Sequence, residues 1–433
     1  MNQLIIRGGV PLRGEVSVSI GKNASLAIIA ASLLCDGTVE LKLPEISDTR
    51  VMLALCREAG AVVTRVGPDR WSIDASDVRA VPISSETARG PAGTTGIRAS
   101  IYMAGALLGR CGRCDVPPPG GDAFGLRPID QHEKAFRTLG AQISPRTDRF
   151  IAEMKETHGK VKIFFDVVTV GGTVNAMLAS VKRDGETLIE NAAKEPHIVD
   201  LANFLCNMGA MISGAGTDTI TITGVKTLHS CKYTPIPDQI EAGTLMVMAA
   251  ATRGDVTLTN VTPVHLSAIA SKLLECGATV ESTAETIRVR CDGRLRHTRI
   301  DTAPTPGFPT DMQPQFAALL TVAEGMSTVR DEIFPNRFSY AGQLRILGAD
   351  IHTGDQSCVI NGRPGLRGAE VGAADIRSAA ALVTAALIAE GETKLSGVEH
   401  LARGYEDLPR KLSLLGADIR SPGNLRLLPV QTA

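Results

Sequence analysis

The sequence predicts an α/β protein made of six copies of one unit, arranged as two pseudo-symmetric domains of three units each. The first observation is a Gly-Ala signature, which occurs six times and joins an apolar helical stretch to an alternating strand. The second is its regular spacing, since successive glycines lie 80, 69, 68, 71 and 68 residues apart, at Gly60, Gly140, Gly209, Gly277, Gly348 and Gly416. The third is the length of 433 residues, which allows two or three domains.

Each predicted unit runs strand–helix–strand–helix–strand over about 70 residues. A helix of small residues ends in a polar-Gly turn and enters a strand, as at 31–41. After the second helix comes Gly-Ala, because a left-handed glycine ends a helix without a Cβ clash. The second unit keeps only a degraded form of the polar-Gly turn, around 104–114. The extra length near it lies in 90–96 and 117–121, and long insertions in regular repeats often carry function.

Composition and charge argue against several classes of protein. Lys and Arg number 45 against 46 Asp and Glu, so the basic excess of a general nucleic-acid binder is missing. Aromatic residues make up 3%, which argues against base-stacking or sugar-stacking grooves. We expect no signal peptide, and the apolar run 24–35 is too short to span a membrane. Nine scattered cysteines indicate reduced thiols in a cytoplasmic protein, and the single Cys111–Cys114 pair lacks a second pair at zinc spacing.

Two segments of the first half contain residues suited to an anionic ligand. Lys22 and Asn23 lie between an expected strand at 15–19 and an apolar helix, where a cation and free N–H groups can hold an anion. The alternative is a solvated lysine beside a capping asparagine. The second segment is a long loop that either closes over a substrate or is a polar surface loop. Its charged and titratable residues are Asp122, Arg127, Asp130 and His132.

Several arginines and one aspartate complete the candidate set. Guanidinium groups brought together bind phosphate and carboxylate through planar, two-pronged hydrogen bonding, although each alone is compatible with an ordinary surface arginine. Asp311 stands between a proline turn and an apolar helix, where an N-cap is the alternative to a catalytic carboxylate. The arginines are Arg98, Arg337, Arg377 and Arg403.

Together these motifs resemble the UDP-N-acetylglucosamine 1-carboxyvinyltransferase family of enolpyruvyl transferases, from about residue 3 to 420. The sister family, 5-enolpyruvylshikimate-3-phosphate synthase, shares the six-unit design but matches these strings poorly. The motifs are Lys22-Asn23, Arg98-Ala-Ser-Ile, the Pro-Gly-Gly loop ending at Arg127-Pro128, Glu190-Asn-Ala-Ala-Lys-Glu195-Pro, Val199-Asp200, Pro237-Asp238, Glu241-Ala-Gly-Thr244, Phe308-Pro-Thr-Asp311-Met-Gln313, Asn336-Arg337-Phe338, Asp375-Ile-Arg377 and Arg403-Gly404-Tyr405-Glu406.

The resemblance implies a two-domain inside-out α/β barrel, with helices buried, sheets outside and a substrate cleft between the domains. One domain is expected at 22–234 and carries the Pro-Gly-Gly loop. The other comprises 1–21 and 235–433 and carries Asp311, Arg337, Arg377 and Arg403. Such clefts close on ligands and bring charges together from both halves.

The implied reaction transfers enolpyruvate from phosphoenolpyruvate to the 3-hydroxyl of UDP-N-acetylglucosamine, the committed step of peptidoglycan synthesis, with no metal, organic cofactor, nucleic acid or membrane partner. By resemblance, Lys22, Arg127, Arg337, Arg377 and Arg403 bind phosphoenolpyruvate, and Lys22, Asp122, Asp311 and Arg403 are catalytic. Asp311 accepts the hydroxyl proton as general base. The residues implied for the UDP-sugar are Asn23, Arg98, Arg127, Pro128, Ile129, Asp130, Thr169, Val170, Gly171, Asp311 and Ile333.

The chain departs from the family pattern in four places. Asp122 stands where a cysteine is common that donates a proton to C3, and an aspartate donates only from its acid form, so activity should fall as pH rises. Ile20 replaces a glycine, Gln239 an arginine and Val167 a lysine. The lost cations keep a second hypothesis open, an enolpyruvyl transferase for another nucleotide acceptor such as UMP. A third is a catalytically idle paralogue that regulates by binding.

Overall fold

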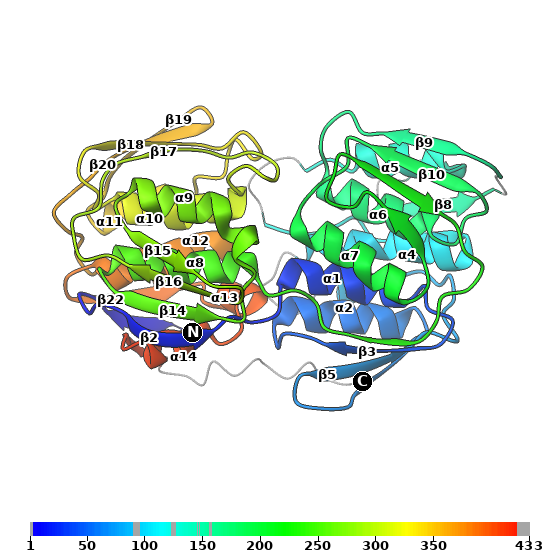
Figure 1. Ribbon diagram of the computed structural model, residues 1–433, viewed down its shortest axis with the longest axis horizontal. Helices are drawn as coiled ribbons and strands as arrows, with labels where there is room; N and C mark the ends of the chain where they lie inside the picture. Colours follow the sequence, from blue (N-terminus) through cyan, green and yellow to red (C-terminus); the bar gives the residue numbers. More distant parts are fainter. Residues whose placement is uncertain are drawn as a thin grey trace. The chain divides into compact units, whose positions relative to one another are not determined.

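The computed structural model describes residues 3–89, 96–122, 127–144, 146, 148–155 and 158–421 (Figure 1). Most of the first expected insertion, 90–95, and residues 123–126 of the loop lie outside this described part. The described chain divides into two compact units. One comprises 20–122 and 127–236, and the other comprises 3–19 and 237–421.

Within the described residues, the unit of 20–236 holds three sheets. The first sheet has the strand order β13 (Cys231–Tyr233), β3 (Thr38–Lys42), β5 (Arg70–Asp74), β4 (Val62–Arg65). The second has the order β6 (Arg113–Val116), β8 (Phe150–Met154), β7 (Ala141–Ile143). The third has the order β11 (Met211–Ser213), β12 (Thr219–Thr223), β10 (Glu186–Glu190), β9 (Val161–Phe164). Its helices are α1 (Lys22–Ser32), α2 (Ser47–Glu58), α3 (Ser85–Arg89), the 3₁₀ helix η1 (Arg98–Ile101), α4 (Tyr102–Cys111), α5 (Asp130–Thr138), α6 (Val170–Ser180) and α7 (Pro196–Asn207).

The other unit also has three sheets in its described part. The first has the strand order β15 (Thr279–Ser282), β16 (Thr286–Arg290), β14 (Asp255–Thr259), β2 (Arg13–Ser17). The second has the order β17 (Arg299–Asp301), β18 (Met326–Arg330), β20 (Ser357–Asn361), β19 (Asp350–Gly354). The third has the order β21 (Glu370–Gly372), β22 (Glu392–Ser396), β1 (Leu4–Arg7), β23 (Asp418–Arg420). Its helices are α8 (Gln239–Ala251), η2 (Pro263–Leu266), α9 (Ser267–Glu275), η3 (Thr310–Met312), α10 (Gln313–Leu320), α11 (Tyr340–Ile346), α12 (Ile376–Ile388), α13 (Glu399–Gly404) and α14 (Leu408–Leu414).

The repeat contains one strand more than the sequence pattern predicted. Strands β9 and β10 are parallel and flank α6, and the chain then passes through α7 into the antiparallel hairpin β11–β12. The same order occurs from β17 to β20. The strand after Gly-Ala is therefore followed by a second, antiparallel strand that completes a hairpin. This second strand was not predicted because it has no sequence signature of its own.

Two edge strands are exchanged between repeats at the points where the chain passes between the units. The strand before α1, β2, pairs in parallel with β14 of the fourth repeat. The strand before α8, β13, pairs in parallel with β3 of the first repeat. Each four-stranded sheet has one edge strand that pairs in parallel with its neighbour. In these two sheets that edge strand comes from a distant part of the sequence.

The small-residue helices are the inner helices of each unit. Every residue of α10 is buried, and in α12 every residue from 376 to 387 is buried. Helices that are apolar on all sides need partners all round, so the sheets lie outside them, as Figure 1 shows for the sheet of β17, β18 and β20 beside α10. Small residues allow close helix crossing: a Cβ on Gly109 of α4 would lie 2.3 Å from the carbonyl oxygen of Leu178 in α6. This arrangement confirms the predicted inside-out α/β class.

The predicted helix-ending glycines are confirmed. All six glycines of the Gly-Ala signature have positive φ, between 91° and 103°. Among the residues that the structure describes, the second repeat is the incomplete one: its sheet β6–β8–β7 has three strands, and a backbone bond from Ile83 N to the Asp115 carbonyl, at 2.9 Å, takes the place of the parallel edge strand.

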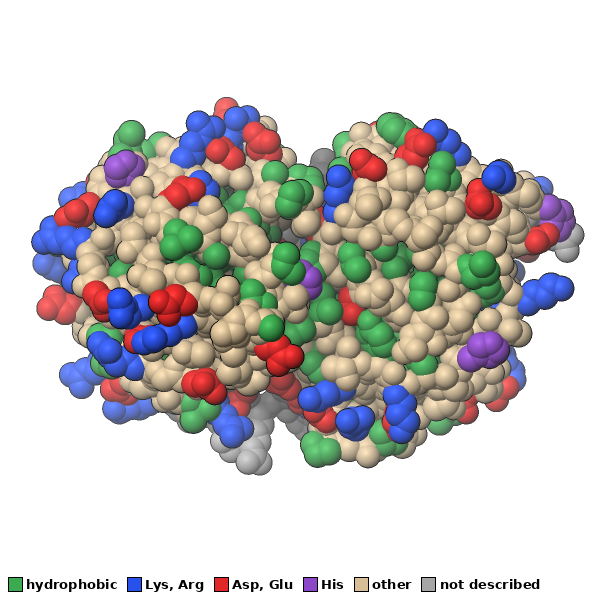
Figure 2. Space-filling model, viewed as in Figure 1, with side chains coloured by type: hydrophobic (Ala, Val, Ile, Leu, Met, Phe, Trp, Pro, Cys, Tyr) green, Lys and Arg blue, Asp and Glu red, His purple; other side chains and the backbone are tan. Residues whose placement is uncertain are grey.

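The surface has mixed charge. On the face shown in Figure 2, Lys and Arg side chains lie beside Asp and Glu side chains in each unit, in keeping with a net charge of −1. Across the described ranges, none of the helices combines the length and apolar character that crossing a membrane requires. All nine cysteines are free thiols.

Candidate active site

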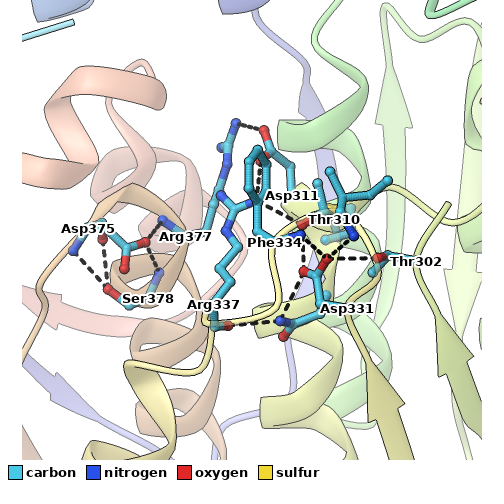
Figure 3. A network of polar contacts seen from close by, with 12 residues as sticks. Thr302, Thr310, Asp311, Asp331, Phe334, Arg337, Asp375, Arg377 and Ser378 are labelled. Atoms are coloured by element: carbon cyan, nitrogen blue, oxygen red, sulfur yellow. Dashed lines mark hydrogen bonds and ion pairs between the residues drawn. The ribbon is translucent and has the colours of Figure 1, made fainter. Parts of the chain in front are cut away.

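The carboxylate of Asp311 lies between two arginines (Figure 3). Arg337 donates from Nη1 to Oδ1 at 2.8 Å, and Arg377 donates from Nη2 to Oδ2 at 2.8 Å. Both arginine side chains are almost fully buried, whereas Asp311 keeps 26% of its side-chain surface exposed. Asp311 caps no helix, because η3 begins after Pro309 and α10 after Met312, so the N-cap alternative is wrong.

The two arginines set the charge state of Asp311. Burial alone would raise the pKa of its carboxyl, but the charges and hydrogen bonds of Arg377 and Arg337 outweigh burial and hold that pKa well below its ordinary value. Asp311 in turn raises the pKa of Arg377 against the effect of burial. The trio is therefore one carboxylate with two cations, and its excess positive charge favours an anion.

Arg377 is held rigidly at the start of α12. Asp375 caps this helix by accepting from the backbone N–H groups of Arg377 and Ser378, both at 2.9 Å. The guanidinium also donates from Nη1 to the Tyr405 hydroxyl at 3.2 Å, and Tyr405 bonds to Thr244 of α8 at 3.0 Å. The Arg377 backbone is thus held by Asp375, and its guanidinium is held by Asp311 and by Tyr405, as a preorganised anion site requires.

The predicted Arg403 belongs to the same neighbourhood. It lies in α13 with its side chain buried. Its neighbour Gly404 approaches α12 so closely that a Cβ there would lie 2.7 Å from Ile376 and 3.8 Å from the Arg377 guanidinium. Ile333, also predicted, is in the turn that precedes Arg337, and its backbone N–H is hydrogen-bonded. Arg403 therefore adjoins a residue that approaches Arg377, and Ile333 is bonded to Asp331, whose other oxygen contacts the residue before Asp311.

In the other unit, Lys22 opens α1 and lies 3.3 Å from the Asp48 carboxylate of α2. Asn23 is the second residue of this helix. The N-cap is Gly21, without a side-chain hydrogen bond, so the alternative of a capping asparagine is wrong.

Arg98 holds the end of the predicted loop. Its Nη2 donates to the carbonyl of Arg127 at 2.6 Å and to that of Pro128 at 3.1 Å. Burial, with the nearby charge of Arg127, lowers the pKa of Arg98 to about 10. Gly121 approaches both arginines, because a Cβ there would lie 3.1 Å from Arg127 and 3.2 Å from Arg98. Asp122, beside it, is half-buried.

The two segments predicted for the nucleotide meet through a buried histidine. Gly171 of α6 lies against His132 of α5, where a Cβ would be 2.9 Å from the imidazole. Asn175 Nδ2 lies 2.7 Å from His132 Nδ1, and burial lowers the pKa of His132 to about 4. Thr169 caps α6 by accepting from Gly172 N at 3.1 Å. Residues 127–130 and 169–171 therefore adjoin one helix pair. Sequence reasoning placed His132 in the loop; the structure places it in a helix.

The structure assigns the predicted residues to two separate units. Lys22, Asn23, Arg98, Asp122, 127–130 and 169–171 belong to one unit, and Asp311, Ile333, Arg337, Arg377 and Arg403 belong to the other. Sequence reasoning missed the buried hydroxyl and carboxyl groups that hold the arginines, among them Asp331, because a polar residue after a strand looks like an ordinary turn residue. No group of three His, Cys, Asp or Glu side chains suited to a metal occurs within the ranges that the structure describes.

Comparison with known proteins defines the class. Residues 6–412 match the family model of EPSP synthase (3-phosphoshikimate 1-carboxyvinyltransferase), whose members are enolpyruvyl transferases. The enolpyruvyl transferase NikO from Streptomyces tendae has the same fold, with a TM-score of 0.85 and 26% identity, covering 97% of this chain and 98% of that one. An EPSP synthase from Acinetobacter baumannii matches in fold, with a TM-score of 0.72 and 20% identity over 98% of this chain and 100% of its own.

Relatives at higher identity narrow the class. UDP-N-acetylglucosamine 1-carboxyvinyltransferase 3 of Caldanaerobacter subterraneus subsp. tengcongensis is 47% identical, over 97% of this chain and 99% of its own. UDP-N-acetylglucosamine 1-carboxyvinyltransferase of Clostridium botulinum is 43% identical, over 97% and 99%. The chain belongs to the UDP-N-acetylglucosamine 1-carboxyvinyltransferase family, and the resemblance seen in the sequence is confirmed.

Proposed function

We propose that this protein transfers the enolpyruvyl group of phosphoenolpyruvate to the 3-hydroxyl of UDP-N-acetylglucosamine and releases phosphate. Identity of 47% over nearly the whole chain to a relative of that name supports the reaction. The observation that carries it chemically is Asp311 between two buried guanidiniums, a base beside an anion site. The free thiols suit a cytoplasmic enzyme of peptidoglycan precursor synthesis.

Phosphoenolpyruvate has a phosphate and a carboxylate, and several cations are needed to neutralise them. We assign this role to Lys22 and Arg127 of one unit and to Arg337, Arg377 and Arg403 of the other. Planar guanidinium forks suit both anionic groups. Buried arginines in fixed positions lose little side-chain entropy when the anion binds, so the preorganised Arg377 should contribute strongly.

The base role of Asp311 conflicts with the contacts that it makes to Arg337 and Arg377 in the structure. A carboxylate held by two guanidiniums is a poor proton acceptor, because protonation would break both charge-assisted bonds. The conflict is removed if the substrate anion takes over the two arginines. Asp311 then turns to the acceptor hydroxyl with its pKa raised towards the ordinary range, and it becomes a base only when both substrates are bound.

The remaining steps follow from the assigned residues. Asp122 gives a proton to C3, the hydroxyl oxygen bonds to C2 as Asp311 takes its proton, and a tetrahedral ketal forms. Phosphate then leaves with the electrons of its C2–O bond and with the proton that Asp311 took, one C3 proton returns to Asp122, and the enol ether of the product forms; neither a metal nor an organic cofactor enters this balance. Asn23 and Arg98 hold the acceptor, with 127–130, 169–171 and Ile333 around the nucleotide.

A second candidate is transfer to a different nucleotide, such as UMP. Two residues favour it. Val167 is 59% exposed and precedes the 169–171 segment, where it supplies no charge for a diphosphate, and Gln239 opens α8 without a charge. A diphosphate gains more than a monophosphate from cations at this position, so their loss weakens UDP-sugars selectively.

A phosphate-release assay separates the candidates. The protein is incubated with phosphoenolpyruvate and either UDP-N-acetylglucosamine or UMP. Release with the UDP-sugar alone supports the proposed function, and release with UMP alone supports the second candidate. Release with neither acceptor would identify an idle paralogue, which calorimetry with the same ligands would then characterise as a binding protein.

A further inference from the structure

Asp331 is a fully buried carboxylate that the assigned chemistry leaves without a role. It follows β18 and accepts hydrogen bonds from three separate segments of one unit (Figure 3). A buried carboxylate destabilises the fold unless its lone pairs accept hydrogen bonds. The donors that bond to Asp331 therefore show which segments of the chain this residue fixes in place.

The two oxygens of Asp331 face different partners. Oδ1 accepts from the Thr302 hydroxyl at 2.8 Å and from the backbone N–H groups of Ile333 and Phe334 at 3.0 and 2.9 Å. These contacts shape the turn after β18. Oδ2 accepts from the Thr310 hydroxyl at 2.6 Å, with Gln313 Nε2 at 3.4 Å. Thr310 immediately precedes Asp311, so the second oxygen faces the candidate active site.

The Thr310 hydroxyl connects Asp331 to Arg337. A hydroxyl has one proton, and an ionised carboxylate can only accept, so Thr310 must give its proton to Asp331. Its lone pairs are then left for Arg337, whose Nη1 donates to the Thr310 oxygen at 3.1 Å and to Asp311 at 2.8 Å. Gln313 fixes the backbone of the same arginine, since its Nε2 donates to the Arg337 carbonyl at 2.9 Å.

We propose that Asp331 is a positioning residue for enolpyruvyl transfer: by taking the Thr310 proton it makes Thr310 a fixed acceptor that aims Arg337 at the substrate anion. This inference rests on the proposed function. It matters most when Asp311 has turned to the acceptor hydroxyl, because Thr310 still accepts from Arg337 Nη1 after Asp311 has left that guanidinium.

Four variants separate aiming from simple support of the fold. Thr310→Val keeps the side-chain shape and removes the hydroxyl, whereas Thr310→Ser restores it. Asp331→Asn puts an amide donor opposite Thr310 and reverses the bond. Thr302→Val is the matched control, because it removes a hydroxyl from the other oxygen of Asp331, away from Arg337.

Steady-state rates with phosphoenolpyruvate and UDP-N-acetylglucosamine give the readout. We expect Thr310→Val and Asp331→Asn to raise the KM for phosphoenolpyruvate about tenfold or more, the effect of one charge-assisted hydrogen bond. Thr310→Ser and Thr302→Val should stay within about threefold of wild type, with Thr302→Val lowering only the melting temperature. The double variant Thr310→Val/Asp331→Asn should be no worse than the worse single variant, since both cut one connection.

Other outcomes overturn the inference. An equal KM increase in Thr302→Val and Thr310→Val would show that Asp331 only supports the fold, and an unchanged KM in Thr310→Val would remove the connection. If Asp331→Asn does not fold, the three threonine variants decide. If the wild-type protein releases no phosphate with any acceptor, the proposed function fails instead, and calorimetry with phosphoenolpyruvate on the threonine variants then tests the aiming of Arg337 by itself.

Discussion

Replacing Asp311 by asparagine tests two consequences of one geometry. The amide keeps the shape but cannot accept a proton, and loss of a general base typically lowers turnover by about 10²–10⁴-fold. The same change removes the charge that occupies Arg337 and Arg377 at 2.8 Å each. A hydrogen bond to a charged group is worth about 1.5–3 kcal/mol. If the substrate anion no longer has to displace Asp311 from even one arginine, phosphoenolpyruvate should bind about 10- to 100-fold more tightly.

Turnover is measured by phosphate release, and binding by calorimetry with phosphoenolpyruvate in the absence of acceptor. Asp255→Asn is the matched control, because it breaks a two-pronged surface pair with Arg288, at 2.8 and 2.7 Å, in the same unit. It should change neither quantity. Near-wild-type turnover in Asp311→Asn would refute the base assignment. Unchanged or weaker phosphoenolpyruvate binding would refute the idea that Asp311 competes with the substrate anion.

Three further predictions concern other residues. Arg403→Ala should weaken phosphoenolpyruvate far more than the UDP-sugar in initial-rate measurements, and equal weakening would contradict its place in the anion site. The wild-type protein should resist fosfomycin, which by family resemblance alkylates a loop cysteine, because Asp122 is a weak nucleophile and burial raises the pKa of Cys56, Cys114, Cys276 and Cys358 to about 12. Asp122→Cys should restore time-dependent inactivation, and a wild-type cysteine adduct in mass spectra would contradict this. The folded-state pKa of His132, about 4 against an ordinary 6.5, gives stability that is present above pH 6.5 and lost as pH falls towards 4. The free energy of unfolding, measured by urea titration at pH 7.5 and at pH 5, should therefore change by about 2 kcal/mol more in wild type than in His132→Gln, and equal changes would rule out a buried neutral imidazole.

Local signals predicted much of the architecture. The Gly-Ala signature identified six helix ends, and all six glycines adopt the left-handed conformation, because ending a helix there depends on the residue itself. That the small-residue helices lie inside was implied by the family resemblance, and the structure shows α10 and α12 buried. The extra hairpin strand and the exchange of β2 and β13 were not predicted, since strand pairing depends on distant partners that alternate like any other strand.

The candidate site divides in the same way. Residue types and motif order were enough to select Asp311 and its arginines, because anion binding needs guanidiniums wherever they stand in the chain. Position in the chain could not decide between a helix cap and an ion-paired carboxylate for Asp311, and the structure decided for the pair. Asp331 had no signal, since a turn aspartate and a buried hydrogen-bond centre have the same local sequence.

The sequence by itself determined the six-unit design, the family and the residues able to hold an anion, because repeats, helix-ending glycines and charged motifs are properties of neighbouring residues. Only the tertiary structure decided which carboxylate faces which cation. It joins segments such as 302, 310 and 331 that are separated along the chain, and the charge state of Asp311 and the aim of Arg337 follow from distances of about 3 Å between them. Such distances arise only when the inner helices and outer sheets have packed.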